Sequence, residues 1–275
     1  MSRLSHILVA LAAAAGIAAA SALPSLADSG SPSGTTTTPT TTAVPTTTTT
    51  ATPAAAQKAK HTGAARTMLR VESVFPAAGQ LRVYTVAVRR SPSPHAGVIK
   101  LMHQFRDDYR IQVVLAVATR IGTDRKPWYR ISIPMRPNGT YGWIPARTVS
   151  LAPTVSELVI HRASRTLDVF WHGKLALHAI VAVGAPGMET PVGHFYVAAR
   201  FVPYQDPFLG VFAVETSAYS KLTEWPGGGV VGVHGTSMPQ LLGQAVSHGC
   251  VRVSNQTAAA LRRLAPLGTP IWITD

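Results

Sequence analysis

The sequence predicts a mainly β protein, namely a β-sandwich or barrel with one short helix, preceded by a smaller β-barrel. Short β-branched runs recur along the chain, and 21 prolines and 22 glycines are distributed among them. Residues typical of long helices are scarce after the first 30 positions, which argues against a helical bundle or coiled coil. The 46% of hydrophobic residues excludes a chain too polar to form a core.

The first segment of the chain, residues 1–27, has the pattern of an export signal. Arg3 provides a short basic region, and an apolar Ala-rich run covers residues 7–20. In Ser25-Leu26-Ala27 the first and third residues are small, as a signal peptidase requires for cleavage after residue 27. The apolar run is shorter than the roughly 20 residues that a membrane-spanning helix needs. We therefore expect an exported, extracytoplasmic protein. An uncleaved segment would instead hold the chain at the membrane.

A Thr/Pro-rich linker, residues 28–67, follows the signal segment. Its threonine runs, interrupted by prolines, bury too little apolar surface to offset their ordering entropy, so we expect a disordered tether. The remaining residues, 68–275, are enough for one large or two small domains. We place the boundary near Pro153, which separates a small β domain at 68–152 from a second domain at 153–275.

The small β domain is expected to contain a tight hairpin. Its strand-like runs cover residues 81–88, 110–117, 128–133 and 141–144. Asn138 and Gly139 lie between the last two runs and predict a two-residue turn, because both turn positions need positive φ. Together with Thr140 they also match an N-glycosylation sequon, which is the alternative interpretation.

This domain resembles a bacterial Src-homology-3-like barrel. The resemblance depends on Val88-Arg89-Arg90-Ser91-Pro92-Ser93-Pro94, on Trp128-Tyr129-Arg130 and on Gly142-Trp143-Ile144. It implies a barrel that binds wall components or packs on a neighbouring catalytic domain. The alternative is that Trp128 and Trp143 are simply core aromatics of a small barrel.

The second domain is expected to be mostly antiparallel β with one short helix. Its strand-like runs cover residues 158–160, 166–171, 175–183, 194–198, 211–214, 230–234, 250–253 and 270–274. Ser254 or Asn255 can cap a helix after the seventh run, and Pro266 with Gly268 ends it.

Cys250 is the single cysteine, which excludes an intramolecular disulfide and any multi-cysteine metal site. A catalytic cysteine needs a base to form thiolate and backbone N–H groups to hold an oxyanion. His234 ends a strand-like run that could lie beside the Cys250 strand. Gly249 has no side chain, so a substrate carbonyl can approach the main chain, and the Cys250 N–H is a natural oxyanion donor.

His248 lies two positions before Cys250, so the two side chains share a face if the chain is extended there. A zinc site made by His234, His248 and Cys250 is the competing interpretation, since the ligand types are adequate. No acidic base accompanies them, so this interpretation fits a metallopeptidase poorly. We therefore expect no metal and no cofactor.

The motifs of this domain resemble the L,D-transpeptidases of the YkuD type, which are cysteine enzymes that cross-link peptidoglycan. The matching motifs are Ser247-His248-Gly249-Cys250-Val251-Arg252, His234-Gly235, Thr190-Pro191-Val192-Gly193-His194-Phe195, Leu242-Gly243 and Gly268-Thr269-Pro270-Ile271-Trp272-Ile273. The resemblance covers roughly residues 154–274 and implies a YkuD-like β fold.

The resemblance also implies roles for the motif residues. Cys250 is the nucleophile and His234 is the base and the acid that protonates the leaving group. His248 is the third catalytic residue and shapes the site with Gly249. Gly249, Ser247 and Gly235 form the oxyanion loop, and the carbonyl of Gly235 or of Thr236 orients the base. Thr236 is also assigned to substrate binding.

Arg252 occupies a position where some members of the family carry Asn. Its planar guanidinium matches a substrate carboxylate, as on stem peptides. The alternative is a structural ion pair, or hydrogen bonds, that brace the catalytic loop. The segment 201–229, rich in aromatic residues and glycines, is a candidate flap over the cleft.

The activity that the resemblance implies is formation of 3→3 cross-links between peptidoglycan stem peptides through a thioester, with carbapenems acylating the cysteine. Water as acceptor would give an L,D-carboxypeptidase, and a protein acceptor would give wall attachment. The third alternative is mainly a wall-binding module with weak catalysis. The formal charge of +13 suits an anionic cell wall. Nucleic acid is not expected as a partner, because the basic residues are dispersed without a recognition motif.

Overall fold

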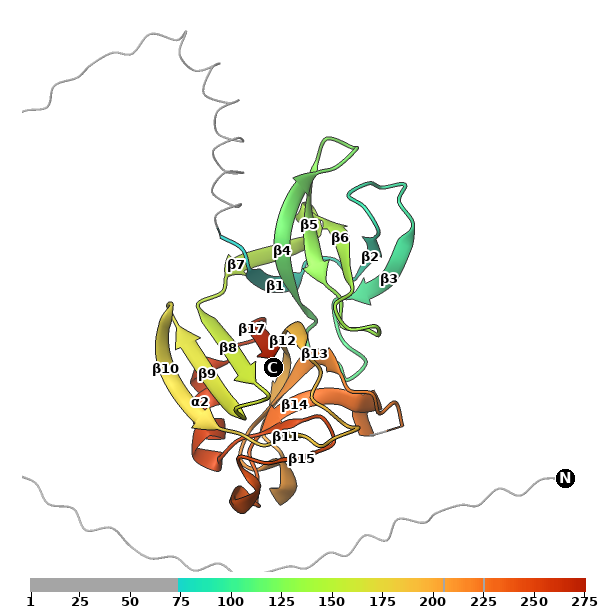
Figure 1. The fold of residues 1–275 in the computed structure, drawn as a ribbon. Coiled ribbons are helices and arrows are strands. Elements are labelled where there is room, and N and C mark those ends of the chain that lie inside the picture. The colour runs from blue at the N-terminus through green and yellow to red at the C-terminus, as the bar shows by residue number, and fades with distance from the viewer. Residues whose placement is uncertain (1–73, 205, 225) are drawn as a thin grey trace, which may run out of the picture. The chain divides into compact units, whose positions relative to one another are not determined.

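The computed structural model describes residues 74–275, apart from residues 205 and 225. The predicted signal segment and linker lie outside these residues. The described part belongs to one compact unit, Pro53–Asp275. It contains two large sheets, a two-stranded ribbon and one α-helix, so the predicted mainly β fold is confirmed (Figure 1). No helix in this part of the chain is both long and apolar enough to cross a bilayer.

The first sheet has seven antiparallel strands in the order β3-β2-β6-β5-β4-β1-β7. The strands are β1 (Ala77–Leu81), β2 (Thr85–Arg89), β3 (Val98–His103), β4 (Val113–Ile121), β5 (Pro127–Ser132), β6 (Tyr141–Pro145) and β7 (Val149–Pro153). A short 3-10 helix, η2 (Ala146–Thr148), precedes β7. Buried aliphatic side chains fill the core of this sheet, with Val88, Val114, Ile131 and Ile144 fully enclosed.

Two predictions for this sheet were wrong. The run at 81–88 is split between β1 and β2 by a bend, and β3 was not predicted. Asn138 and Gly139 do not form a two-residue turn, because only Gly139 has positive φ and eight residues separate β5 from β6. The Asn138 side chain instead exchanges two hydrogen bonds with the backbone of Tyr219, at 2.8 and 3.0 Å, and this long-range contact determines the shape of the loop.

The second sheet has eight strands in the order β10-β9-β8-β17-β12-β13-β14-β16. Its strands are β8 (Ser156–His161), β9 (Thr166–Trp171), β10 (Lys174–Ile180), β12 (Gly193–Phe201), β13 (Ala213–Tyr219), β14 (Val230–His234), β16 (Val251–Arg252) and β17 (Pro270–Thr274). β11 (Val183–Gly184) and β15 (Ala245–Ser247) form a separate parallel ribbon. Most pairs are antiparallel, as predicted, but β8 with β17 and β14 with β16 are parallel.

The α-helix α2 (Asn255–Leu264) covers the core of the second sheet. Ser254 is its N-cap, because its hydroxyl accepts a hydrogen bond from the Thr257 N–H. Leu261 and Ala258 are fully buried on the inner face. Three short 3-10 helices complete the elements: η3 (Pro207–Leu209), η4 (Pro226–Gly229) and η5 (Pro239–Leu241).

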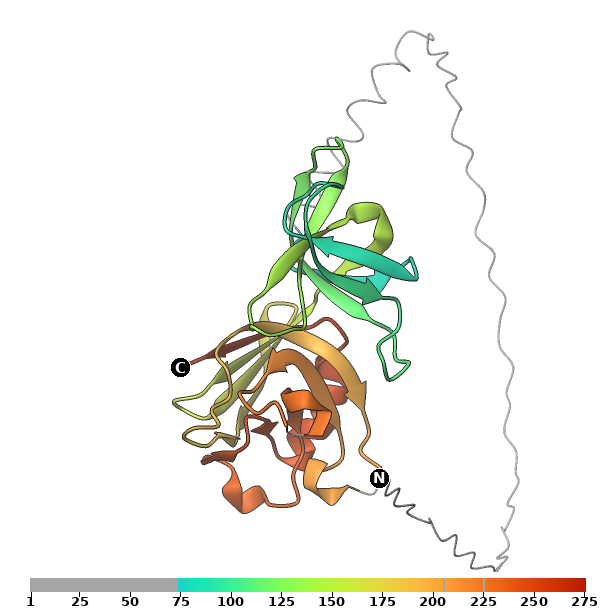
Figure 2. The same ribbon diagram turned by 90° about the vertical axis from the view of Figure 1, so that its right-hand side faces the viewer.

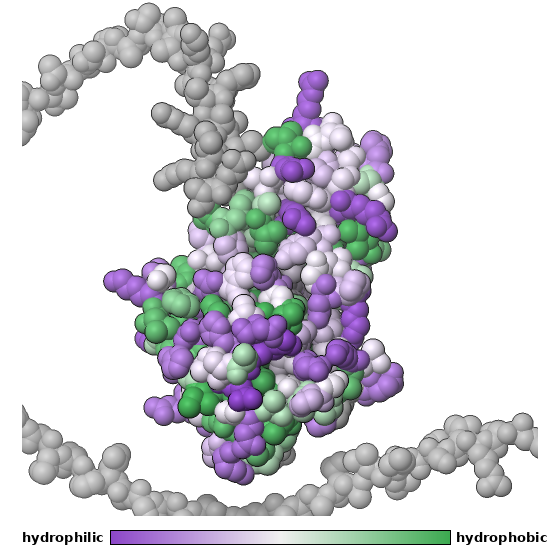
Figure 3. Space-filling view, viewed as in Figure 1, coloured by the Kyte–Doolittle hydropathy of each residue, from purple (hydrophilic) through white to green (hydrophobic). Residues whose placement is uncertain are grey.

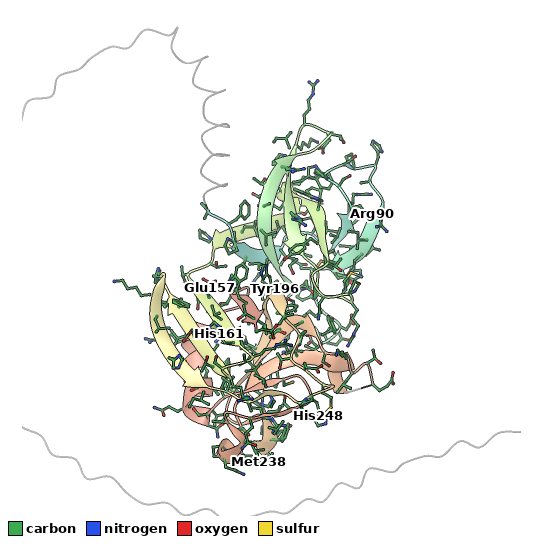
Figure 4. All side chains as sticks on the ribbon, viewed as in Figure 1. Arg90, Glu157, His161, Tyr196, Met238 and His248 are labelled. Atoms are coloured by element: carbon green, nitrogen blue, oxygen red, sulfur yellow. The ribbon has the colours of Figure 1, made fainter. Side chains whose placement is uncertain are left out.

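The chain passes from one sheet to the other between Pro153 and Ser156, close to the predicted boundary. That the two parts are independent domains stays a prediction. Hydrogen bonds join them: the buried Tyr196, labelled in Figure 4, donates from its hydroxyl to the Val113 carbonyl at 3.1 Å. Residues 104–112 reach from the first sheet to β13 of the second (Figure 2). Polar and apolar side chains are interspersed on the face shown in Figure 3.

Candidate active site

Cys250 and His234 are brought together by two neighbouring strands. β14 ends at His234 and runs parallel to β16, which begins directly after Cys250, with His234 opposite Arg252. The predicted adjacency of these two segments is therefore confirmed. Both side chains line one cavity of about 500 Å³.

Gly232 lies between the two side chains and was not predicted to be a site residue. Its backbone N–H donates to the Cys250 Sγ at 3.3 Å. A Cβ at this position would lie 3.8 Å from the His234 Cδ2 and 3.9 Å from the Cys250 Sγ. The sequence signal was a glycine inside a β-branched strand, which often marks the close approach of a ligand.

His234 is oriented by a backbone carbonyl. Its Nδ1 lies 2.6 Å from the Gly235 oxygen, and because a carbonyl only accepts, Nδ1 carries the proton. The Nε2 of the neutral ring is then free of a proton and can accept one. The geometry selects Gly235 rather than Thr236 as the orienting carbonyl, the two alternatives that the resemblance left open.

Burial determines the charge state of both side chains. Burial raises the pKa of the Cys250 thiol, although the Gly232 N–H and the Arg252 guanidinium act in the opposite direction. Burial also lowers the pKa of His234; the hydrogen bond to Gly235 opposes this shift, the nearby Arg252 adds to it, and Asp206 opposes it. At neutral pH the pair is consequently a thiol and a neutral imidazole.

The turn that carries Cys250 is closed by Ser247. The Ser247 hydroxyl donates to the Cys250 carbonyl at 2.5 Å and accepts from the Gly249 N–H at 3.1 Å. Gly249 has a φ of +116°, and a Cβ there would lie 2.9 Å from the Ser220 Cβ. Only glycine therefore fits this position without strain.

Thr190 braces this turn from a distant part of the chain. Its fully buried hydroxyl donates to the Gly249 carbonyl and accepts from the Gly184 N–H, both at 2.9 Å. Thr190, the first residue of the Thr-Pro motif, therefore holds the turn that carries Cys250 against the ribbon of β11 and β15.

Asn255 supports the loop after His234. Its Oδ1 accepts hydrogen bonds from the N–H groups of Thr236 and Val211, at 3.2 and 3.3 Å. Thr236 is buried, and its hydroxyl accepts from the Met238 N–H at 3.0 Å. Thr236 does not line the cavity, so its observed contacts are those of a loop-bracing residue.

Arg252 is only 5% exposed and does not line the cavity. Its guanidinium lies over the ring of Phe208, 4.6 Å from the centroid, and its Nε has no hydrogen-bond partner in the described chain. No described carboxylate lies within ion-pair distance of it. Its charge acts through space: it opposes the burial that raises the pKa of Cys250 and adds to the burial that lowers the pKa of His234.

His248, labelled in Figure 4, does not line the cavity that contains Cys250 and His234. Residues 248–250 lie outside both β15 and β16, so the condition for His248 and Cys250 to share a strand face is not met. No group of three or more metal-ligating side chains gathers within residues 74–275 as described.

The cavity also contains residues that the sequence did not single out as site residues. The Phe208 ring lies 5.9 Å from the His234 ring, centroid to centroid. The other lining residues not predicted are Arg106, Asp108, Phe201, Asp206, Leu209, Ala213, Val214, Glu215, Gly227 and Val230. Arg106 and Asp108 come from the first sheet's side of the molecule, which no local motif could indicate.

A thiol beside an imidazole whose Nδ1 is held by a carbonyl, in a cavity of a mainly β domain, defines a candidate cysteine acyl-transfer site. Residues 156–273 match the YkuD family, the L,D-transpeptidase catalytic domain. The resemblance noted in the sequence is thus confirmed for this segment of the chain. The Src-homology-3-like character of the first sheet stays a prediction.

Relatives with this domain occur in Bacillus. The chain is 32% identical over 118 residues to a protein of Bacillus licheniformis named as an L,D-transpeptidase, YkuD, and 28% identical over 117 residues to the YkuD protein of Bacillus subtilis. These matches include 43% and 42% of this chain. The chain spans 65% of the length of each of these two relatives.

Solved structures of L,D-transpeptidases are also similar. One from Mycobacterium smegmatis has 18% identity and a TM-score of 0.37, covering 54% of this chain and 90% of that chain. L,D-transpeptidase 3 from Mycobacterium tuberculosis, in complex with a faropenem-derived adduct, has 16% identity and a TM-score of 0.40, covering 74% of this chain and 97% of that chain.

Proposed function

We propose that this protein is a peptidoglycan L,D-transpeptidase that forms 3→3 cross-links through a Cys250 thioester. The observation that carries the proposal is the His234–Gly235 hydrogen bond in a cavity that also contains the Cys250 sulfur. This hydrogen bond leaves Nε2 of His234 as a proton acceptor, and burial keeps the Cys250 thiol protonated.

In the first step, the Cys250 proton moves to Nε2 of His234 as the sulfur attacks the carbonyl between the third and fourth residues of a donor tetrapeptide. The C–N bond of the tetrahedral intermediate then breaks. The imidazolium returns the proton to the leaving amine, so D-alanine departs and a thioester remains.

In the second step, the side-chain amine of the third residue of another stem peptide attacks the thioester carbonyl. His234 takes a proton from the attacking nitrogen, the C–S bond breaks, and the thiol is restored. The product is a new amide bond between two stems.

The oxyanion of each intermediate would be held by the Cys250 N–H, which takes part in none of the described hydrogen bonds. The Gly249 N–H, by contrast, already donates to Ser247. Arg252 adds positive charge near the developing thiolate without contacting the substrate. We extend the proposal to an exported protein whose partner is the peptidoglycan of the cell wall.

Intact mass spectrometry of the full chain, incubated with a disaccharide tetrapeptide and separately with a carbapenem, tests the proposal. We expect an adduct on the wild type and none on Cys250→Ala, with D-alanine released and a cross-linked dimer formed. Release of D-alanine with only tripeptide product would indicate an L,D-carboxypeptidase. No adduct with either compound would favour a wall-binding module.

A further inference from the structure

The cavity above Cys250 has walls from both sheets. In the described chain it is lined by one cationic side chain, Arg106, and this residue belongs to the segment 104–112 that joins β3 to β4. Asp108 of the same segment also lines the cavity. Arg252, the arginine of the catalytic motif, is buried behind Phe208 and outside the lining.

Arg106 is held in place on one edge of its guanidinium. Its Nη2 forms an ion pair with the Glu215 carboxylate, and its Nε donates to Asp108 at 3.3 Å. The Nη1 makes no hydrogen bond within the described residues, and it is not buried. Two carboxylates, those of Glu215 and Asp108, hold the Nε and Nη2 edge of the guanidinium, and the Nη1 N–H groups remain for a third.

The pairing of β13 with β14 links the ion-pair partner of this guanidinium to the backbone group that contacts the Cys250 sulfur. Glu215, its partner, lies directly opposite Gly232 in the β13–β14 ladder, and the Gly232 N–H contacts the Cys250 Sγ. Directly paired residues of an antiparallel sheet are about 5 Å apart and project to the same face. The ion-pair partner of Arg106 and the hydrogen-bond partner of the sulfur are therefore neighbours in the sheet, and Arg106 and Cys250 line the same cavity.

We propose that Arg106 binds the terminal carboxylate of the donor peptide, one residue beyond the bond that Cys250 attacks, so that the amino-terminal β part of the chain completes the substrate site. The inference rests on the proposed function, because the donor of that reaction loses a terminal residue with a free carboxylate. Binding there places the scissile carbonyl at the sulfur and selects donors that end at this residue.

Arg110 provides a matched control. It shares the Glu215 carboxylate, with Nη2 2.9 Å from Oε1, so it also takes part in the contact between the two sheets. It does not line the cavity, and its Nη1 is buried without a hydrogen-bond partner. A role in joining the sheets is common to both arginines, whereas access to the cavity belongs to Arg106.

The test compares a tetrapeptide donor with the same peptide carrying a terminal carboxamide. Acyl-enzyme formation is followed by intact mass for the full-length wild type, Arg106→Gln, Arg106→Lys and Arg110→Gln. We expect the wild type to prefer the carboxylate donor by about 10- to 100-fold in kcat/KM, the range of a charge-assisted hydrogen bond. Arg106→Gln should reduce this preference to less than about threefold, whereas Arg110→Gln should retain it.

Equal use of the two donors by the wild type would overturn the proposal, and so would an unchanged preference in Arg106→Gln. If Arg106→Gln does not fold, Arg106→Lys decides, because it keeps the charge but loses the planar fork; it should show a reduced preference. A wild type that forms no acyl-enzyme with either donor would instead refute the proposed function itself.

Discussion

The two sheets of this protein contribute to the cavity in different ways. The eight-stranded sheet supplies Cys250, His234 and the turn around them, all within recognisable motifs. The seven-stranded sheet supplies Arg106 and Asp108 from a loop without a motif. The comparison indicates that the centre of the cavity is built from segments with recognisable motifs, whereas residues at its rim can come from any loop that the fold brings there.

Substitutions of Cys250 and His234 should have the largest effect on acylation. They test whether the two reacting groups both come from the eight-stranded sheet. Cys250→Ala removes the nucleophile and should abolish the acyl-enzyme. His234→Gln keeps a polar side chain but loses the proton acceptor, so acylation should slow by about 10²- to 10⁴-fold. Time-resolved intact mass spectrometry with the tetrapeptide donor measures both. An unchanged rate in His234→Gln would assign the base to another residue.

Gly232→Ala tests whether the space between the His234 and Cys250 side chains, both on the side of the eight-stranded sheet, is needed for acylation. The added methyl group meets its neighbours at 3.4 to 3.9 Å, so the fold should accept it, yet it lies between the imidazole and the sulfur. We expect acylation to fall by about 10²-fold, as for a misplaced reacting group. The melting temperature should change by no more than about 4 °C.

Gly97→Ala is the matched control for that substitution, because a Cβ at Gly97 meets only the Arg90 side chain, at 3.6 Å, far from the catalytic motifs in the chain. It should leave acylation unchanged. A Gly232→Ala enzyme as fast as this control would mean that the space between the two side chains is not used by the substrate.

The pH dependence of acylation tests whether burial lowers the pKa of His234. The pKa of His234 is lowered by burial, so the ring becomes protonated, and stops acting as a base, only below its ordinary value near 6.5. kcat/KM for acylation should therefore remain close to its plateau at pH 6.5 and fall about tenfold per pH unit below the lowered pKa.

Arg252→Gln should move this acid limb to higher pH, because the guanidinium contributes to the lowering of the His234 pKa. The pH–rate profiles of the two proteins, measured at one ionic strength, provide the comparison. An acid limb that lies above pH 6.5 in the wild type would contradict the assignment of a buried neutral imidazole.

The smallest expected effect concerns the second contact between the sheets. Asn138→Ala removes both hydrogen bonds to the Tyr219 backbone and should destabilise the protein by about 1–2 kcal/mol, seen as a lower melting temperature. Asn138→Asp keeps the acceptor and loses the donor, so it should be intermediate. A melting temperature equal to that of the wild type would show that this contact does not hold the sheets together.

Several elements followed from local pattern alone. The strands Thr166–Trp171, Val230–His234 and Pro270–Thr274 have the predicted bounds, because alternation of buried and exposed residues is a local property. The helix after Ser254 was also predicted, together with its cap. That the segments carrying His234 and Cys250 could lie side by side was also predicted, and the pairing of β14 with β16 confirms it.

The predicted two-residue turn shows where local pattern fails. Asn138-Gly139 has the preferred composition, yet the two-residue turn with positive φ at both positions is His172-Gly173, between β9 and β10. Strand pairing across the sheet fixes the length of that connection, and the Asn138 amide is engaged by Tyr219, 81 positions away. Tertiary contacts of this kind override turn propensity.

By itself, the sequence determined the class of fold and indicated the motifs that contain Cys250 and His234, because these depend on residue type and on spacing along the chain. Only the tertiary structure decided that Gly235 orients His234, that Gly232 separates the pair, and that Arg106 rather than Arg252 reaches the cavity. The physical reason is that burial, hydrogen-bond partners and access to a cavity arise from segments far apart in the chain, which no local pattern records.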